Sequence, residues 1–305
     1  MRLEQEEEEL ANKLKNFFSR EPGYFFETIA GTGAFGVALA FRNSNAQPGE
    51  YQRIAVKGMT WGQEDIAPEK EALELLKWAE HIVTRIKISF QPGRSTRWIN
   101  ENTIITEYLE NGTLDRFQEK LRTRYHLTRA CIGMAYPPGD LSKEPKGPSD
   151  QILETIGEVS NRIRMTMEHG DMHSGNIMFA DLDRNEHRRF PLLKLIDFGL
   201  ANPNEFAIEE NISAVGSVIS ELICHGRDFQ QLVRDKRGDN LLDPNLDPEL
   251  VKLVARCISE NPHRRPSLSN LFSIVRQKSQ QTYPDIPEET DRYISELVQK
   301  YIFDV

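Results

Sequence analysis

Two patterns of apolar residues divide the chain near residue 110. From residue 24 to 108, the runs YFFETIA, VALAFR, QRIAVKG, RIKISF and TIITEY predict strands. One helix at PEKEALELLKWAE and a polar turn at QPGRSTRWINEN lie between them. From residue 111 onward the pattern is mostly helical, with short predicted strands at NIMFA and LLKLI. A β-rich part followed by a larger helical part predicts an α+β fold.

The first twenty residues predict an amphipathic helix with a run of glutamates on one side. Five apolar side chains share roughly the other side: Leu3, Leu10, Leu14, Phe17 and Phe18. We favour a helix packed on the domain with its acidic side in solvent, and a partner-binding helix is the alternative. The predicted organisation is therefore this helix at 1–20, a β-rich lobe at 21–109, and a helical lobe at 110–305 that includes a C-terminal helix.

Composition restricts the partners and the compartment. The chain has 305 residues, enough for two lobes, and a net charge of −9, which argues against a nucleic-acid or anionic-membrane surface. The start MRLEQEEEEL is too acidic for a signal peptide, and no apolar run approaches transmembrane length. Cys131, Cys224 and Cys257 lie in apolar helical patterns, which predicts buried thiols. We expect an intracellular, cytoplasmic protein, with the nucleus as an alternative.

A glycine-rich segment and a strand lysine are the first candidates for chemistry. Gly31, Gly33 and Gly36 lie between two strands in GTGAFG. Glycines let backbone N–H groups approach phosphates closely, although a plain hairpin turn is the alternative. Lys57 lies inside the apolar strand IAVKG, where it needs a counter-charge or a phosphate unless its ammonium group reaches solvent. Its place on the next strand but one after the glycines favours the phosphate.

Three polar side chains in two loops add catalytic and metal-binding chemistry. In HGDMHSGNIMF, Asp171 can accept a hydroxyl proton, and Asn176 offers an oxygen ligand for Mg²⁺. In KLIDFGL, Asp197 follows an apolar strand and can also bind Mg²⁺. Each loop taken alone is equally consistent with ordinary turn chemistry.

Taken together, these segments resemble the protein-kinase signature set in order and spacing. EHIV resembles the segment before the family's fourth strand, and IITEYLENGTL resembles its hinge. NISAVGSVISEL and NPHRRPSLSNL resemble two later helical motifs, the second with Arg265 as its arginine. The resemblance spans about residues 24–275. RACIGMAYPP and EETDRYISELVQKYIFDV are similar to a large group of fungal kinase-like proteins. The resemblance to protein kinases implies a bilobal protein-kinase-like fold with a small β-rich N-lobe, one main helix in that lobe, and a larger helical C-lobe.

The resemblance implies an ATP site. Lys57 would pair with the α- and β-phosphates and with a helix glutamate, either Glu69 or Glu71. Glu107 and Leu109 would offer hinge backbone groups, and Thr106 would be the gatekeeper residue. The remaining members of the implied nucleotide-binding set are Ile29, Gly31, Gly33, Gly36, Ala55 and Met178.

The resemblance also assigns the catalytic and metal-binding roles. Asp171 would orient the acceptor hydroxyl and take its proton. Asn176 and Asp197 would hold Mg²⁺. With Lys57 present as well, the four key polar residues argue against a dead pseudokinase.

Two substitutions in the catalytic loop depart from the protein-kinase pattern. Gly170 occupies a position where protein kinases often carry the arginine that couples activation-loop phosphorylation to catalysis, so we expect no such switching. His173 occupies the place of a lysine typical of Ser/Thr kinases. The loop is therefore closer to aminoglycoside- and choline-type small-molecule kinases. His173 either bonds the γ-phosphate or is simply satisfied within the loop.

The third departure is a shortened activation segment. Between Gly199 and Asn211 lies only LANPNEFAIEE, without Ala-Pro-Glu and without Ser, Thr or Tyr. Asn211 aligns with the aspartate that begins the next helix in the family. In the family, the arginine at the place of Arg265 ordinarily pairs with the glutamate of Ala-Pro-Glu. The alternative partners for Arg265 in this chain are another glutamate, solvent or a backbone group. The candidate glutamates are Glu205, Glu209 and Glu210.

The leading hypothesis is an ATP- and Mg²⁺-dependent phosphotransferase, organised without activation-loop phosphorylation. Protein Ser/Thr phosphorylation is the conventional expectation. A small-molecule hydroxyl kinase is the second hypothesis. The third is a non-catalytic ATP-binding scaffold, with DLSKEPKGPSD and the acidic N-terminal helix as its partner surfaces. We expect no nucleic-acid and no membrane partner.

Overall fold

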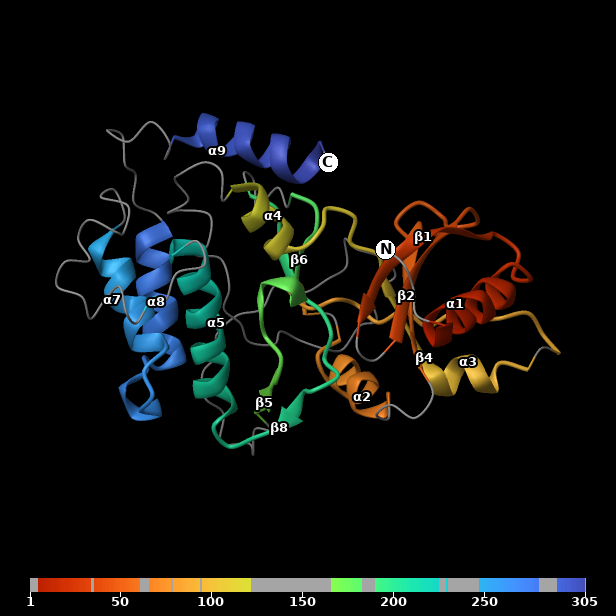
Figure 1. Cartoon of the computed structure of the whole chain (residues 1–305), viewed down its shortest axis with the longest axis horizontal. Helices are drawn as coiled ribbons and strands as arrows, with labels where there is room; N and C mark the ends of the chain where they lie inside the picture. Colours follow the sequence, from red (N-terminus) through yellow and green to blue (C-terminus); the bar gives the residue numbers. More distant parts are fainter. Residues whose placement is uncertain are drawn as a thin grey trace. The chain divides into compact units, whose positions relative to one another are not determined.

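The chain folds as a mixed α+β protein, seen here in a computed structural model (Figure 1). The structure describes residues 5–33, 36–60, 66–77, 79–93, 95–121, 166–182, 190–224, 229, 247–279 and 290–304. These residues form two compact units, one that ends at Tyr108 and one that begins at Leu109. In this part of the chain, no helix combines the length and the apolar character that crossing a membrane requires.

The first unit is built on a four-stranded antiparallel sheet in chain order. Its strands are β1 (Tyr24–Gly33), β2 (Gly36–Asn43), β3 (Arg53–Met59) and β4 (Thr103–Glu107). Side chains alternate between the two faces, as the strand pattern predicts. Ile54 and Val56 belong to the hydrophobic core on one face, and Ala55 and Lys57 therefore point to the other.

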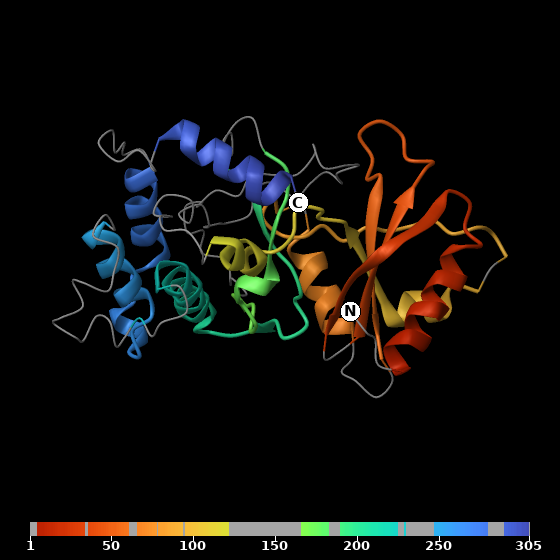
Figure 2. The ribbon, with the colours of Figure 1, turned by 45° about the horizontal axis from the view of Figure 1, so that its top comes forward.

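Helix α1 (Gln5–Phe18) covers the core face of this sheet. Its residues Leu10, Leu14 and Phe18 are buried in one cluster with β2 and β3. Gly58 of β3 permits this close packing, because a Cβ there would lie 3.1 Å from a methyl carbon of Leu14. The packed-helix interpretation of the N-terminal segment is thus confirmed. Figure 2 shows α1 and α2 (Ala67–Leu75) on opposite sides of the strands.

Three predictions for this unit were wrong in detail. RIKISF forms only an isolated bridge between Arg85 and Thr106 and one further bond to β4, from Ile86 N–H to the Ile105 carbonyl at 2.8 Å. The predicted polar turn contains helix α3 (Arg97–Asn102), which forms because Ile99 packs into the α1-side core. The helix predicted from PEKEALELLKWAE already ends at Leu75.

The second unit contains two small antiparallel sheets and a group of helices. β5 (Met167–Glu168) pairs with β8 (Asn202–Pro203), and β6 (Ile177–Phe179) pairs with β7 (Leu193–Leu195). The helices are α4 (Leu114–Leu121), α5 (Ala207–Cys224), α7 (Pro248–Cys257), α8 (Leu268–Ser279) and α9 (Asp291–Val298), with the short turns η2 (Ser174–Asn176), η4 (Pro262–Arg264) and the π-helix η6 (Gln299–Phe303).

A hydrophobic core joins α4, the β6–β7 pair, α5, α9 and η6. Beside it, Gly216 lets α5 approach α7, because a Cβ there would lie 2.6 Å from the Cβ of Cys257. Cys224 and Cys257 are buried, as predicted, and burial raises the pKa of the Cys257 thiol to about 11. The sequence also predicts helices at LRTRYHLTRACIGMAYPP, which holds Cys131, and at QILETIGEVSNRIRM. These two segments and DLSKEPKGPSD fall on residues that the structure does not describe, apart from Leu121, the first residue of the first segment.

Candidate active site

An ion pair on the open face of the sheet joins β3 to α2. The Lys57 Nζ lies 2.8 Å from Glu69 Oε2, and Glu69 is buried. Pro68 suits the first turn of the helix, so Glu69 is presented within the first turn of α2. A buried carboxylate requires a counter-charge. This pairing decides between the two candidate glutamates, since Glu71 is exposed.

Small side chains surround Lys57 on this face. Lys57 lies opposite Ala38 in β2, and Ala38 lies opposite Gly31 in β1, so one row across three strands ends at the glycine-rich segment. Ala55 shares the face two residues away, opposite Thr106 in β4. Directly opposed residues share a face of an antiparallel sheet. Four predicted nucleotide-site residues, Gly31, Ala55, Lys57 and Thr106, are therefore brought to one face.

Ile29 corrects one part of the predicted nucleotide-binding set. It pairs with Leu39, and its side chain packs against the core on the α1 side. That side is opposite to the face of Lys57. The register shift between Ile29 and Gly31 causes this, because the extra residue returns Gly31 to the lysine row while Ile29 keeps the core register.

Of the three glycines in the glycine-rich segment, packing requires one and leaves the other two open. A Cβ on Gly36 would lie 2.0 Å from the Gly58 carbonyl oxygen, and the φ of Gly36 is +153°. Gly36 is thus required by the fold. A Cβ on Gly31 or Gly33 would meet no heavy atom within 4 Å. Since packing does not require glycine at these two positions, their bare backbone is a surface that a phosphate can approach.

The predicted hinge segment is fixed through Glu107. Its buried carboxylate accepts the N–H of Thr84 at 2.8 Å, and its own N–H donates to the Thr84 carbonyl at 3.0 Å. The Thr106 hydroxyl donates to the Glu107 carbonyl at 3.1 Å. Leu109, the other predicted hinge residue, is buried at the start of the second unit.

In the second unit, Asn176 holds the candidate base Asp171. Its side-chain nitrogen donates to Asp171 Oδ2 at 3.1 Å and to the Asp171 carbonyl at 2.9 Å. Because the amide nitrogen is used in this way, the atom that Asn176 can offer to a cation is Oδ1. The same contact fixes the Asp171 carboxylate in orientation.

Asp197 lies at the same end of the β6–β7 pair as Asn176. The carbonyl of Asn176 accepts the N–H of Ile196 at 3.0 Å, and Asp197 follows directly. Asp197 has φ +59°, in the left-handed region that few non-glycine residues adopt. Such strained conformations are concentrated at functional sites. Its Oδ1 accepts the N–H of Gly199 at 3.4 Å.

His169, which the sequence analysis did not single out, links the two loops. Its Nδ1 accepts the N–H of Asp171 at 3.3 Å, so Nε2 carries the proton and donates to the Ile196 carbonyl at 3.0 Å. Its ring lies 4.6 Å from that of Phe198. Burial lowers the pKa of His169, and the bond to Ile196 and the charges of Asp197 and Asp171 oppose this only in part. The signal for this residue in the sequence was its position two residues before Asp171 in HGDMHSGNIMF.

Asn211, in the second turn of α5 (Ala207–Cys224), fixes the backbone before Asp171 through two hydrogen bonds. Its Oδ1 accepts the His169 N–H at 3.0 Å, and its Nδ2 donates to the Met167 carbonyl at 2.9 Å. An amide serves one donor and one acceptor at once, which a carboxylate cannot do. The asparagine at a position where the resemblance expects aspartate therefore matches its two backbone partners.

Gly170 and His173 are the two unusual residues of the loop. Gly170 has φ +78°, and a Cβ there would lie 2.3 Å from the Leu200 carbonyl oxygen, so no arginine fits without a backbone shift. His173 is half exposed, accepts the Gly175 N–H at Nδ1, and has Nε2 3.7 Å from Asp171 Oδ2. It lies beside the candidate base, with Nε2 as the nitrogen that can donate to a ligand.

The segment after Gly199 is held by two short hydrogen bonds. Asn204 accepts the Thr166 hydroxyl at its carbonyl, 2.6 Å away, and its side-chain nitrogen donates to Glu168 at 2.7 Å. Helix α5 then begins at Ala207, four residues before Asn211.

Met178 completes the predicted set in this unit. Its neighbours Ile177 and Phe179 belong to the hydrophobic core, so Met178 points away from that core.

No group of three His, Cys, Asp or Glu side chains suited to a metal occurs within the ranges that the structure describes. A Mg²⁺ ion that is shared with phosphates needs only one or two protein carboxylates. No model of a known protein family matches the chain.

Proposed function

We propose that the chain is an ATP- and Mg²⁺-dependent phosphotransferase of the protein-kinase-like superfamily with a bilobal fold. The observation that carries the proposal is the grouping of Asp171, Asn176 and Asp197 at one end of the β6–β7 pair. The Lys57–Glu69 pair, on one sheet face with Gly31, supports it independently. A lysine that already has a counter-ion, next to an open glycine backbone, suits the phosphates of a nucleotide.

Each side chain has a defined task in this proposal. Asp171, oriented by Asn176, accepts the proton of the acceptor hydroxyl, whose oxygen bonds to the γ-phosphorus as ADP leaves. Asn176 Oδ1 and the Asp197 carboxylate would hold Mg²⁺, and the ion would supply positive charge next to the phosphates. Lys57, held by Glu69, orients the α- and β-phosphates. Catalysis in such a site is mainly positioning and charge neutralisation.

The loop is organised without a phosphorylated residue. Asn211 and His169 fix the backbone around Asp171 through direct hydrogen bonds. Gly170 has no side chain that could sense a phosphate, and the segment from Leu200 to Glu210 carries no hydroxyl. We therefore propose a constitutively organised catalytic loop.

A protein Ser/Thr acceptor is the first candidate. A small-molecule hydroxyl acceptor is favoured by a specific observation, since His173 lies beside Asp171 and the segment on which a peptide would dock is short. A non-catalytic ATP-binding scaffold is the remaining alternative, and it predicts nucleotide binding without turnover.

Nucleotide binding is tested by the melting temperature with and without Mg-ATP. Binding to the folded state alone stabilises by RT ln(1 + [L]/Kd), so at 100 Kd the gain is about 2.7 kcal/mol. We expect a rise for the wild type and none for Lys57→Ala or Asp197→Ala, each compared with its own melting temperature without ATP. Lys252→Ala and Asp181→Ala, at exposed positions, are the matched controls and keep the rise. A wild type that shows no rise at millimolar Mg-ATP contradicts the proposal.

Turnover separates the enzyme from the scaffold. With labelled ATP, we expect phosphate transfer by the wild type and a loss of about 10²-fold or more in Asp171→Asn, since general-base catalysis contributes that much. Label in protein substrates supports a protein kinase. ADP release that a metabolite mixture stimulates, without labelled protein, supports a small-molecule kinase. Binding without any turnover supports the scaffold.

A further inference from the structure

Helix α2 is too short to hold its own position. It has nine residues, and isolated helices of this length are marginal in water. It buries Ala72 and Leu73 and carries Glu69 in its first turn. The distance between Glu69 and Lys57 therefore depends on the tertiary contacts that fix this helix.

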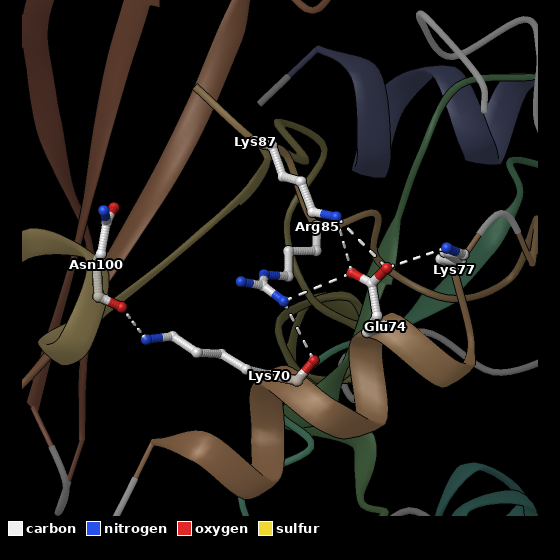
Figure 3. A network of polar contacts seen from close by, with 6 residues as sticks. All are labelled: Lys70, Glu74, Lys77, Arg85, Lys87 and Asn100. Atoms are coloured by element: carbon white, nitrogen blue, oxygen red, sulfur yellow. Dashed lines mark hydrogen bonds and ion pairs between the residues drawn. The ribbon is translucent and has the colours of Figure 1, made fainter. Parts of the chain in front are cut away.

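One polar contact fixes the first turn of α2. The Lys70 ammonium group donates to the Asn100 carbonyl at 2.5 Å (Figure 3). It also donates to the Glu101 carbonyl at 3.3 Å. Both carbonyls belong to the last turn of α3, where a cation is favoured. Ile99 of the same helix is buried in the sheet core, so Lys70 is tied to a fixed element.

A second contact fixes the last turn. The Glu74 carboxylate lies 3.0 Å from Lys77 Nζ, 3.4 Å from Lys87 Nζ and 3.6 Å from Arg85 Nη1 (Figure 3). The Arg85 Nη1 also donates to the Lys70 carbonyl at 3.4 Å. One guanidinium group thus contacts α2 at a side chain of its last turn and at a backbone carbonyl one turn earlier.

The segment that carries Arg85 and Lys87 is itself bonded to the sheet. Arg85 forms a bridge with Thr106, and the Ile86 N–H donates to the Ile105 carbonyl at 2.8 Å. β4 pairs in turn with β3, where Ile104 lies opposite Lys57. The contacts therefore link Lys57 in β3 to Glu69 in α2 by a second route, which runs through β4 and Arg85.

We propose that Glu74 is a positioning residue that, through Arg85 and Lys87, holds α2 so that Glu69 faces Lys57. The catalytic consequence rests on the proposed function, and the structural part does not. Hydrogen bonds from Lys77, and then the charges of Lys87 and Lys77, lower the pKa of Glu74 against the opposing effect of burial. The carboxylate is charged at neutral pH and its electrostatic contacts are favourable.

The experiment measures hydrogen exchange of the α2 amides and steady-state turnover in Glu74→Gln. Glu71→Gln, an exposed neutralisation on the same helix, is the matched control. We expect α2 amides to exchange severalfold faster in Glu74→Gln than in the wild type or Glu71→Gln. We also expect kcat to fall severalfold while the Kd for Mg-ATP changes less than twofold. Arg85→Gln has the same effects, and the double variant is no worse than either single one.

The inference is overturned if the α2 amides of Glu74→Gln exchange at the wild-type rate. It is also overturned if the effects of Glu74→Gln and Arg85→Gln on the exchange rate and kcat simply add in the double variant. Faster exchange with unchanged kcat overturns the positioning role and leaves only a structural one. The exchange measurement needs no nucleotide. A wild type that does not bind Mg-ATP contradicts the proposed function, and the exchange result still decides whether Glu74 fixes α2.

Discussion

Arg265 and Glu210 form an ion pair that joins the loop before α8 to the first turn of α5. Arg265 Nη1 lies 3.1 Å from Glu210 Oε1 and donates to the Glu209 carbonyl at 2.9 Å, while Nε donates to the Ser259 carbonyl at 3.0 Å. The Arg265 side chain is only 8% exposed. Of the three glutamates that the sequence offered, Glu210 is the partner, and backbone contacts occur as well. The short segment therefore keeps an anchor for this arginine without an Ala-Pro-Glu motif.

Arg265→Lys is expected to lower the free energy of unfolding by about 2 kcal/mol, because a lysine cannot reproduce the planar fork that reaches three acceptors. Glu210→Gln, at a carboxylate that is 37% exposed, is expected to cost under about 1 kcal/mol. Urea unfolding measures both. Equal losses in the two variants contradict the view that the backbone contacts of Arg265 matter more than the ion pair.

Gly170→Ala is expected to destabilise strongly. The new Cβ must lie 2.3 Å from the Leu200 carbonyl oxygen in a left-handed backbone. Gly112→Ala is the matched control, since Gly112 has φ +80° and no heavy atom within 4 Å of its Cβ position. The control should cost about 1–2 kcal/mol from backbone strain alone. Gly170→Ala should cost about 1–3 kcal/mol more from the clash.

Thermal and urea unfolding of both glycine variants measure this difference. A Gly170→Ala loss no larger than that of Gly112→Ala shows that the loop can move away from Leu200. In that case the absence of arginine at this position has no steric origin.

His169 predicts a pH dependence of stability. Burial lowers its folded pKa below the ordinary 6.5. Below pH 6.5 the unfolded histidine binds a proton and the folded one resists it, so the unfolded state holds more protons and the free energy of unfolding falls as pH falls. The contribution is complete above pH 6.5 and is lost towards the lowered folded pKa.

The measurement compares the slope of unfolding free energy against pH in the wild type and in His169→Gln. We expect the variant to lose up to about 1.4 kcal/mol per pH unit of this slope below pH 6.5. His263→Gln, at an exposed histidine, should keep the wild-type slope. Identical slopes in the wild type and His169→Gln place the titration of His169 at its ordinary value and refute this account.

Alanine substitutions at Gly36 and Gly33 should affect different properties, stability in the first case and nucleotide binding in the second. Gly36→Ala is expected to cost about 2 kcal/mol or more of stability, because its Cβ would overlap the Gly58 carbonyl. Gly33→Ala should change stability by less than about 0.5 kcal/mol, because its Cβ position is open. If a phosphate contacts the backbone at Gly33, the added Cβ hinders its approach. The loss of one hydrogen bond to the phosphate then weakens Mg-ATP binding roughly tenfold.

Isothermal titration with Mg-ATP and urea unfolding of both variants give the two readouts. A Gly33→Ala variant with wild-type affinity removes Gly33 from the nucleotide site. A Gly36→Ala variant with wild-type stability shows that the β2–β3 contact can open without cost.

Sequence alone determined those features that depend on local pattern. Alternation in β3 placed Lys57 on the face away from the core, and the apolar spacing of α1 predicted its packing, because both follow from backbone periodicity. Proline at position 68 indicated a helix start. The motif order drew attention to Asp171, Asn176 and Asp197, which lie at one end of the β6–β7 pair. RIKISF was predicted as a strand, but it makes only a bridge and one further bond to β4, too few to form one. QPGRSTRWINEN was misjudged because burial of Ile99 outweighed its local propensity.

Only the tertiary structure decided the choices among equivalent residues. Glu69 rather than Glu71 pairs with Lys57, because only Glu69 is buried on the side of α2 that faces β3. Glu210, rather than Glu205 or Glu209, is the glutamate whose carboxylate reaches Arg265. Ile29 faces the core because a register shift separates it from Gly31. Spacing along a chain specifies which faces exist, whereas register and packing between elements select the side chain that reaches its partner.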